Sequence, residues 1–162
     1  MRWITARRVP MQGLLGVHMI TVERTFAVST SADVVVEYLA DFGHTEQWDP
    51  GTQRTTRQGD GPVAPGATWH NISKVLGVTT ELTYTLQELD RDRIVFVGTN
   101  GGATSTDTIT VRPKGAGSEI TYHVDLQMQG AMRLATPAMK VEFEHLATRT
   151  QQRMTEVING LG

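Results

Sequence analysis

Short stretches in which hydrophobic and polar residues alternate make up most of the chain. Alternation with a period of two is typical of β-strands that bury one face. A first strand is predicted over Thr21–Ser29, where Val22, Phe26 and Val28 share one face. Six more strands are predicted over Thr52–Arg57, Thr68–Val75, Thr79–Leu89, Arg93–Thr99, Thr104–Arg112 and Glu119–Gln129. The short turns between these six favour antiparallel neighbours.

Two short helices are predicted between the first strand and the second. Thr30 and Asp33 have the spacing of a capping box in front of an apolar stripe, which indicates a helix that ends near Gly43. The second short helix is predicted over residues 45–48, because Asp49-Pro50 favours extended backbone immediately after it.

A long helix is predicted at the end of the chain. Thr136 has the side chain of an N-cap, Pro137 suits the first helical position, and hydrophobic residues then recur at helical spacing up to Gly160. A single antiparallel sheet has an apolar face to cover, and this helix must pack against it. The sequence therefore predicts an α+β fold with a seven-stranded antiparallel sheet wrapped around a long C-terminal helix, with room for a cavity between them.

Composition and charge narrow the class of protein. The chain has 162 residues, which is the length of one domain, and this domain is predicted over residues 19–162. A formal net charge of −2 argues against a nucleic-acid partner. The absence of cysteine excludes thiolate catalysis and Cys-ligated metals. No apolar run is long enough for stable membrane insertion, and we expect a cytoplasmic protein.

Residues 1–18 differ from the rest of the chain. Arg2, Arg7 and Arg8 precede a weak apolar patch, which is one feature of a secretory signal. The patch is short, however, and no A-x-A cleavage site follows it. We favour a poorly ordered extension, or a start codon assigned too early with Met19 as the true start.

Several segments together resemble one superfamily. These are Val28–Asp33 at the entry to the first helix, Trp48-Asp49-Pro50 at the exit from the second, the strand over Gly66–Val75, Leu82-Thr83-Tyr84, and the helix start Thr136–Met139. Over Thr21 to about Leu161 the chain resembles the SRPBCC superfamily, which includes START-related, birch-pollen-allergen-like and polyketide cyclase/dehydrase proteins with the helix-grip fold. The resemblance implies an internal apolar cavity for a lipid-like or polyketide-like molecule.

The alternation within each strand predicts which side chains face this cavity. Apolar faces of the strands and of the long helix should meet there, and the candidate ligand-binding residues are Trp69, Asn71, Leu82, Tyr84, Leu86, Tyr122, Leu126, Met128, Met139 and Phe143. The alternative is a dry, packed core. Tyr84 and Tyr122 are the strongest candidates, because a buried phenol needs a hydrogen-bonding partner that a ligand or water in a cavity supplies.

Few residues are candidates for chemistry. His70 has a side chain suited to acid/base catalysis and would act with Tyr84 or Tyr122, although a structural role is the simpler interpretation. Asp107 shares the parity of inward-facing residues but is also typical of a solvated strand start. His123 and Asp125 are expected on the exposed face. No metal site and no cofactor is predicted, because no ligand motif or nucleotide motif occurs.

These patterns, together with the activities that the resemblance implies, leave three functions open. The first is binding, carriage or sensing of a hydrophobic small molecule or lipid in the internal cavity, by a monomer or a homodimer. The second is a polyketide cyclase/aromatase or dehydratase that uses the same cavity. The third is a protein-interaction module, which an exposed apolar patch would favour.

Overall fold

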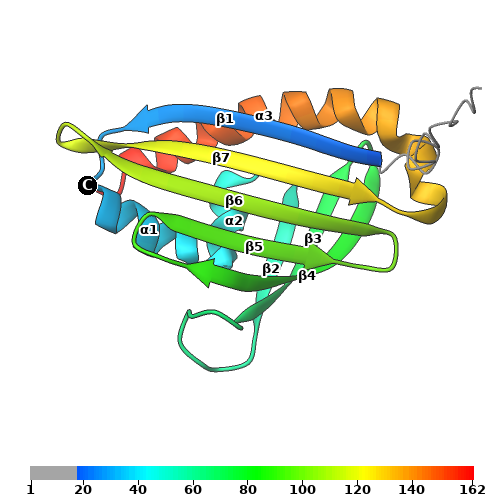
Figure 1. Cartoon of the computed structure of the whole chain (residues 1–162), viewed down its shortest axis with the longest axis horizontal. Helices are drawn as coiled ribbons and strands as arrows, with labels where there is room; N and C mark the ends of the chain where they lie inside the picture. The colour runs from blue at the N-terminus through cyan, green and yellow to red at the C-terminus, as the bar shows by residue number, and fades with distance from the viewer. Residues whose placement is uncertain (1–17) are drawn as a thin grey trace, which may run out of the picture.

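One antiparallel sheet of seven strands dominates the computed structural model, which describes residues 18–162 (Figure 1). The strands are β1 (His18–Val28), β2 (Thr52–Gln58), β3 (Thr68–Val75), β4 (Val78–Leu89), β5 (Arg93–Thr99), β6 (Ala103–Lys114) and β7 (Gly117–Met128). Their order across the sheet is β1-β7-β6-β5-β4-β3-β2. Strands β2 to β7 form a meander, and β1 pairs with β7 at one edge. The predicted sheet is confirmed.

The helices cover one face of this sheet, as Figure 1 shows. Between β1 and β2 lie α1 (Ala32–Ala40), the 3-10 helix η2 (Phe42–His44) and the short α2 (Thr45–Trp48). After β7 come the 3-10 helix η3 (Gly130–Ala135) and the long α3 (Thr136–Asn159), which packs along β1 and against α2. This arrangement confirms the α+β helix-grip fold.

Two predicted helix caps differ from the structure. Thr30 does not cap α1, because its Oγ1 donates a hydrogen bond of 2.6 Å to the carbonyl oxygen of Ile158, at the far end of α3. Ser31 is the N-cap of α1 instead, without a side-chain bond. Thr136 is not an N-cap either but the first residue of α3, because η3 leads directly into this helix from Ala135. Tertiary contacts and the preceding helix therefore override the local signals.

The interior divides into two clusters of buried hydrophobic side chains. The larger, called here the packed cluster, fills the space between the sheet, α1, η2 and the C-terminal half of α3; it includes Phe42, Trp48, Trp69, Leu86, Phe96, Met154 and Ile158. The smaller lies between the β1–β7 edge and the N-terminal half of α3, and comprises Ile20, Val22, Ala103, Val124, Leu126, Met128 and Ala147. The two ends of the sheet are thus covered differently.

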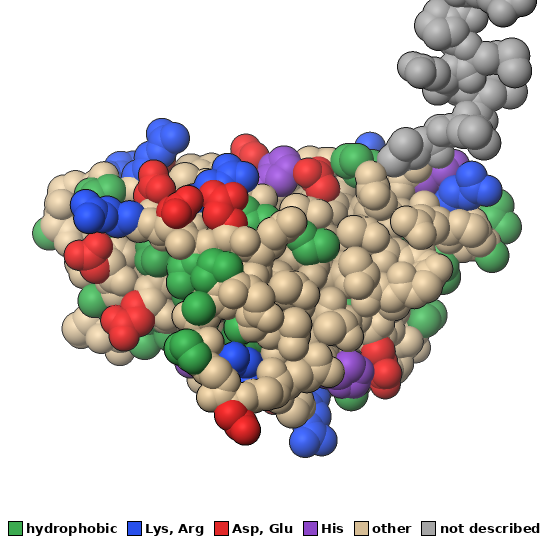
Figure 2. All heavy atoms as spheres, turned by 60° about the horizontal axis from the view of Figure 1, so that its bottom comes forward, with side chains coloured by type: hydrophobic (Ala, Val, Ile, Leu, Met, Phe, Trp, Pro, Cys, Tyr) green, Lys and Arg blue, Asp and Glu red, His purple; other side chains and the backbone are tan. Residues whose placement is uncertain are grey.

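Figure 2 shows one face of the molecule, on which basic and acidic side chains are interspersed. Within residues 18–162, no helix combines the length and apolar character needed to cross a bilayer. His18, the last residue of the predicted extension, pairs with Met128 as the first residue of β1. The other predictions for residues 1–17 lie outside the described residues.

Candidate functional site

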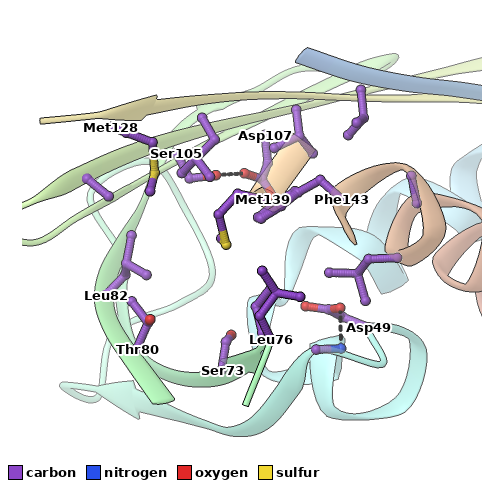
Figure 3. A pocket seen from close by; sticks show the side chains of 18 of the residues that line it. Asp49, Ser73, Leu76, Thr80, Leu82, Ser105, Asp107, Met128, Met139 and Phe143 are labelled. Atoms are coloured by element: carbon purple, nitrogen blue, oxygen red, sulfur yellow. Dashed lines mark hydrogen bonds between the residues drawn. The ribbon is translucent and has the colours of Figure 1, made fainter. Parts of the chain in front are cut away.

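A cavity of about 290 Å³ lies between the N-terminal half of α3 and the sheet (Figure 3). Most of its lining is apolar; hydrophobic side chains come from every adjoining element and include Val22, Leu82, Val124, Leu126, Met128, Met139, Phe143, Leu146 and Ala147. A site of this size is close to the lower end of ligand pockets, which begin at roughly 300 Å³.

Exposed apolar side chains lie where the cavity meets solvent. The turn between β3 and β4 contributes Leu76, which is 50% exposed, and the first residue of β4 is Val78, which is 58% exposed. Met132 in η3 also lines the cavity and is 39% exposed. Leu76 has a positive φ of 52°, in the left-handed region that non-glycine residues seldom adopt. The rim of the cavity is therefore apolar, and part of it lies on a tight turn.

A buried carboxylate stands inside this apolar lining. Along β6 every second residue faces inward, and this alternation brings Asp107 into the cavity wall at 5% exposure. Ser105 Oγ donates a hydrogen bond of 2.7 Å to its Oδ1, and the Tyr122 hydroxyl donates one of 2.9 Å to its Oδ2. Burial raises the pKa of Asp107 to about 6, although both hydrogen bonds act against this rise.

A second carboxylate, Asp49, lines the cavity from the segment after α2 (Figure 3). It accepts hydrogen bonds from the Gly51 backbone N–H at 2.9 Å and from Thr52 Oγ1 at 2.8 Å, which fix the turn into β2. Burial raises its pKa, and these hydrogen bonds, together with the charges of Arg153 and Arg149, act in the opposite direction. Asp49 therefore accepts a hydrogen bond from a backbone N–H and has two arginines nearby, whereas the hydrogen-bond donors to Asp107 are two side-chain hydroxyls.

Two tyrosines share the space around Asp107. Tyr84 lies opposite Gly98 of β5, and a Cβ atom at Gly98 would stand only 2.6 Å from its ring, so a glycine is needed there. Tyr122 packs edge-on against Trp48 with ring centroids 5.7 Å apart. Burial first, and then the charge of Asp107, raise the pKa of both phenols well above the usual value. Both tyrosines therefore stay neutral hydrogen-bond donors.

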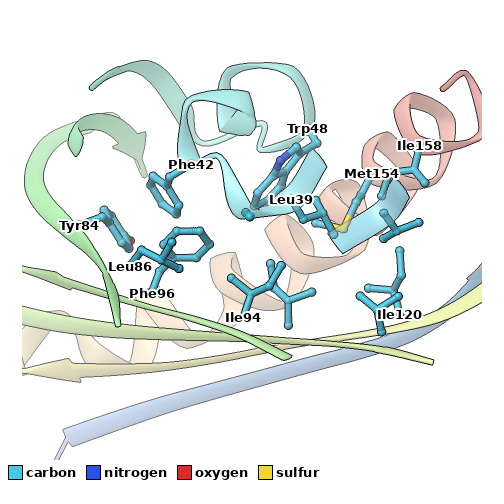
Figure 4. Close-up of a cluster of buried hydrophobic side chains, with 14 of the residues drawn as sticks. Leu39, Phe42, Trp48, Tyr84, Leu86, Ile94, Phe96, Ile120, Met154 and Ile158 are labelled. Atoms are coloured by element: carbon cyan, nitrogen blue, oxygen red, sulfur yellow. The ribbon is translucent and has the colours of Figure 1, made fainter. Parts of the chain in front are cut away.

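Seven of the ten predicted ligand-binding residues line the cavity: Leu82, Tyr84, Tyr122, Leu126, Met128, Met139 and Phe143. The other three face inward but lie elsewhere. Trp69 and Leu86 belong to the packed cluster, whose interior Figure 4 shows. Asn71 is buried and donates hydrogen bonds to Thr52 and Thr55 that hold β2 against β3.

His70 lies on the opposite face of the sheet from the cavity. Its neighbours Trp69 and Asn71 take the inward positions, so His70 points outward, where its Nε2 is 3.3 Å from a carboxylate oxygen of Glu81. The structure therefore does not bring His70 to Tyr84 or Tyr122, and we propose no catalytic role for it. His123 also lies on the outer face, between Glu23 and Asp125, as expected.

The two carboxylates are the acidic side chains of the cavity lining, and sequence reasoning did not assign them to the site. The parity of Asp107 with Ile109 and Val111 did indicate an inward side chain. Asp49 gave no such signal, since it reads only as the end of a short helix before a proline. Within residues 18–162 no group of three His, Asp or Glu side chains is placed to hold a metal ion.

The sequence identifies the family of this fold. The family described as "Polyketide cyclase / dehydrase and lipid transport" matches residues 19–156, and the chain belongs to it. No curated protein matches the sequence significantly. The family and the fold together place the chain in the SRPBCC superfamily, as the resemblance implied.

Solved structures with the same fold are distant in sequence. The Zhui aromatase/cyclase from Streptomyces sp. R1128 is 19% identical, with a TM-score of 0.67 over 88% of this chain and 93% of that one. A START superfamily protein from Mycobacterium smegmatis is 16% identical, with a TM-score of 0.67 over 88% and 99%. Ara h 8.0201 is 12% identical, with a TM-score of 0.56 over 84% and 97%. At these identities the likeness concerns the fold.

Proposed function

We propose that this protein binds a hydrophobic small molecule in the cavity under α3, as a carrier or a sensor. The observation that carries the proposal is a cavity of about 290 Å³ with a largely apolar lining and an apolar rim. Each 100 Å² of apolar ligand surface removed from water contributes about 2.5 kcal/mol, before the entropic cost of association. The hydroxyl groups of Tyr84, Ser105 and Tyr122 would orient the ligand.

A neutral fluorescent probe tests this proposal. The probe is N-phenyl-1-naphthylamine, whose diarylamine nitrogen is unprotonated at neutral pH. Its fluorescence increases in apolar surroundings, and it should bind the folded protein with a saturable signal. Phe143→Trp should raise the Kd, because the larger ring occupies part of the cavity. The matched control is Leu134→Trp, since Leu134 in η3 is 89% exposed and does not line the cavity. Equal Kd values for both variants and the wild type would contradict the assigned site.

A polyketide cyclase/aromatase or dehydratase activity is the second candidate function. The hydrogen bond between Tyr122 and Asp107 supports it, because a carboxyl with a pKa of about 6 can exchange protons with a bound substrate near neutral pH. The similar fold of the Zhui aromatase/cyclase also favours it. Conversion of a poly-β-keto substrate by the wild type, and its loss in Asp107→Asn with binding retained, would place this function first.

Location and assembly stay predictions. We expect a cytoplasmic protein that is monomeric or homodimeric. A net charge of −2 and the interspersed charges of the face in Figure 2 support a small-molecule partner rather than nucleic acid.

A further inference from the structure

The carboxylate of Asp107 lacks a positive partner within the described part of the chain. No salt bridge among residues 18–162 involves it, and its hydrogen-bond donors, Ser105 and Tyr122, are neutral. No Lys, Arg or His side chain lines the cavity. A buried carboxylate is normally paired with a cation, because its desolvation is otherwise uncompensated. The missing cation is therefore the feature of the cavity that most needs an explanation.

We propose that the natural ligand is a hydrophobic amine whose protonated nitrogen pairs with Asp107, while its apolar body fills the cavity beneath α3. This inference rests on the proposed function and names the class of ligand. Ser105 and Tyr122 each occupy one acceptor position of the carboxylate, one on either oxygen, which leaves acceptor positions for the ligand. The two hydroxyls thus hold the carboxylate in a fixed orientation.

The remaining surroundings also favour a cation. Asp49 lines the same cavity, and its charge, which Arg149 and Arg153 offset in part, also disfavours ligands with a carboxylate or phosphate head group. The rings of Tyr84, Tyr122 and Phe143 line it as well, and aromatic faces attract a cation in desolvated surroundings. A neutral alcohol would hydrogen-bond to Asp107 without compensating its charge, so it should bind more weakly than an amine.

Three ligands that differ only in the head group test the inference. They are 2-(1-naphthyl)ethylamine, 2-(1-naphthyl)ethanol and 1-naphthaleneacetic acid, titrated calorimetrically into the full chain at pH 7.5. We expect the amine to bind about tenfold or more tightly than the alcohol, because only the amine adds the attraction of an opposite charge to its hydrogen bond with the carboxylate, and the acid to bind most weakly. This ranking in the wild type needs no variant, and its absence overturns the inference.

Asp107→Asn assigns the preference to one residue. We expect this variant to lose the tenfold preference for the amine over the alcohol, because an amide carries no charge to pair with the ammonium group. The control is Asp125→Asn, on the outer face of β7, which should keep the wild-type ranking. An amine preference that survives in Asp107→Asn overturns the inference.

The outcomes separate this inference from the proposed function. If the three naphthalenes bind with equal affinity, or only the neutral fluorescent probe binds, the inferred preference for an amine is wrong. The proposed binding of hydrophobic molecules in the cavity is then retained. If neither the naphthalenes nor the fluorescent probe binds, both proposals fail.

Discussion

Replacement of Asp107 by Asn should change how the stability of the ligand-free protein depends on pH. The folded protein holds the pKa of this carboxyl at about 6, against an ordinary value of 3.8, because Asp107 is buried. Folding therefore favours the protonated form. The contribution of Asp107 to stability is present in full below pH 3.8 and is lost as the pH rises to about 6. Over these two pH units, at 1.36 kcal/mol each, the loss is about 3 kcal/mol.

The measurement is a difference between two proteins. Guanidinium unfolding of the wild type and of Asp107→Asn, followed by circular dichroism, gives each free energy of unfolding between pH 3.5 and 7.5. The value for the variant minus that for the wild type should rise by about 3 kcal/mol across this range, since only the wild type must bury a charge. The subtraction removes contributions that both proteins share, such as that of His123 on the outer face of the sheet.

Asp125→Asn provides a control of opposite sign. The hydrogen bond from Thr21 Oγ1, at 2.6 Å, is the main cause of a lowered pKa of Asp125, and the neighbouring His123 lowers it further. Asp125 therefore stabilises the fold above its ordinary pKa, and its replacement should make the difference fall as the pH rises. A flat difference for Asp107→Asn would refute the reasoning, because Ser105 and Tyr122 would then stabilise the charged carboxylate fully.

Two further substitutions test the walls of the site. Gly98→Ala should lower the free energy of unfolding by about 1–3 kcal/mol and weaken binding of the fluorescent probe, because its Cβ would meet the Tyr84 ring; unchanged melting and binding would contradict this close packing. His70→Ala should leave the probe Kd within about twofold of the wild type and stability within about 0.5 kcal/mol, because its contact with Glu81 is on the surface. A large loss of binding would restore His70 to the site.

The order of elements followed from the sequence because each element carries its own periodicity. Alternation placed the inward faces of β4 and β7, where Leu82, Tyr84 and Tyr122 do point toward the helices. The long helix began within one residue of its predicted start, at Thr136. The periodicity of hydrophobic residues and the positions of turn residues are local properties of the sequence. Strands joined by short turns then pair with their neighbours in the chain, which determines the order of the sheet.

Alternation predicts which side chains of a strand face inward, but not which element packs over each of them. Leu82 and Leu86 share one face of β4, yet Leu82 lines the cavity, whereas Leu86 packs against the aromatic side chains beneath η2. The difference depends on where η2 and α3 cross the sheet, which is a tertiary property. Thr30 is a similar case, because its partner is the carbonyl of Ile158, 128 residues further along the chain.

The position of Asp107 links the stability of the fold to the function that we propose. The packed cluster places the rings of Phe42, Trp69 and Phe96 in mutual contact, and it stabilises the fold independently of the cavity. Asp107 stands at the border of that cluster, where Tyr122 contacts Trp48 on one side and the carboxylate on the other. A solid apolar core at this border would be more stable than a cavity with a buried charge. Sequences depart from local optimisation mainly at functional sites, which supports our proposal that the ligand binds at the cavity end of the sheet.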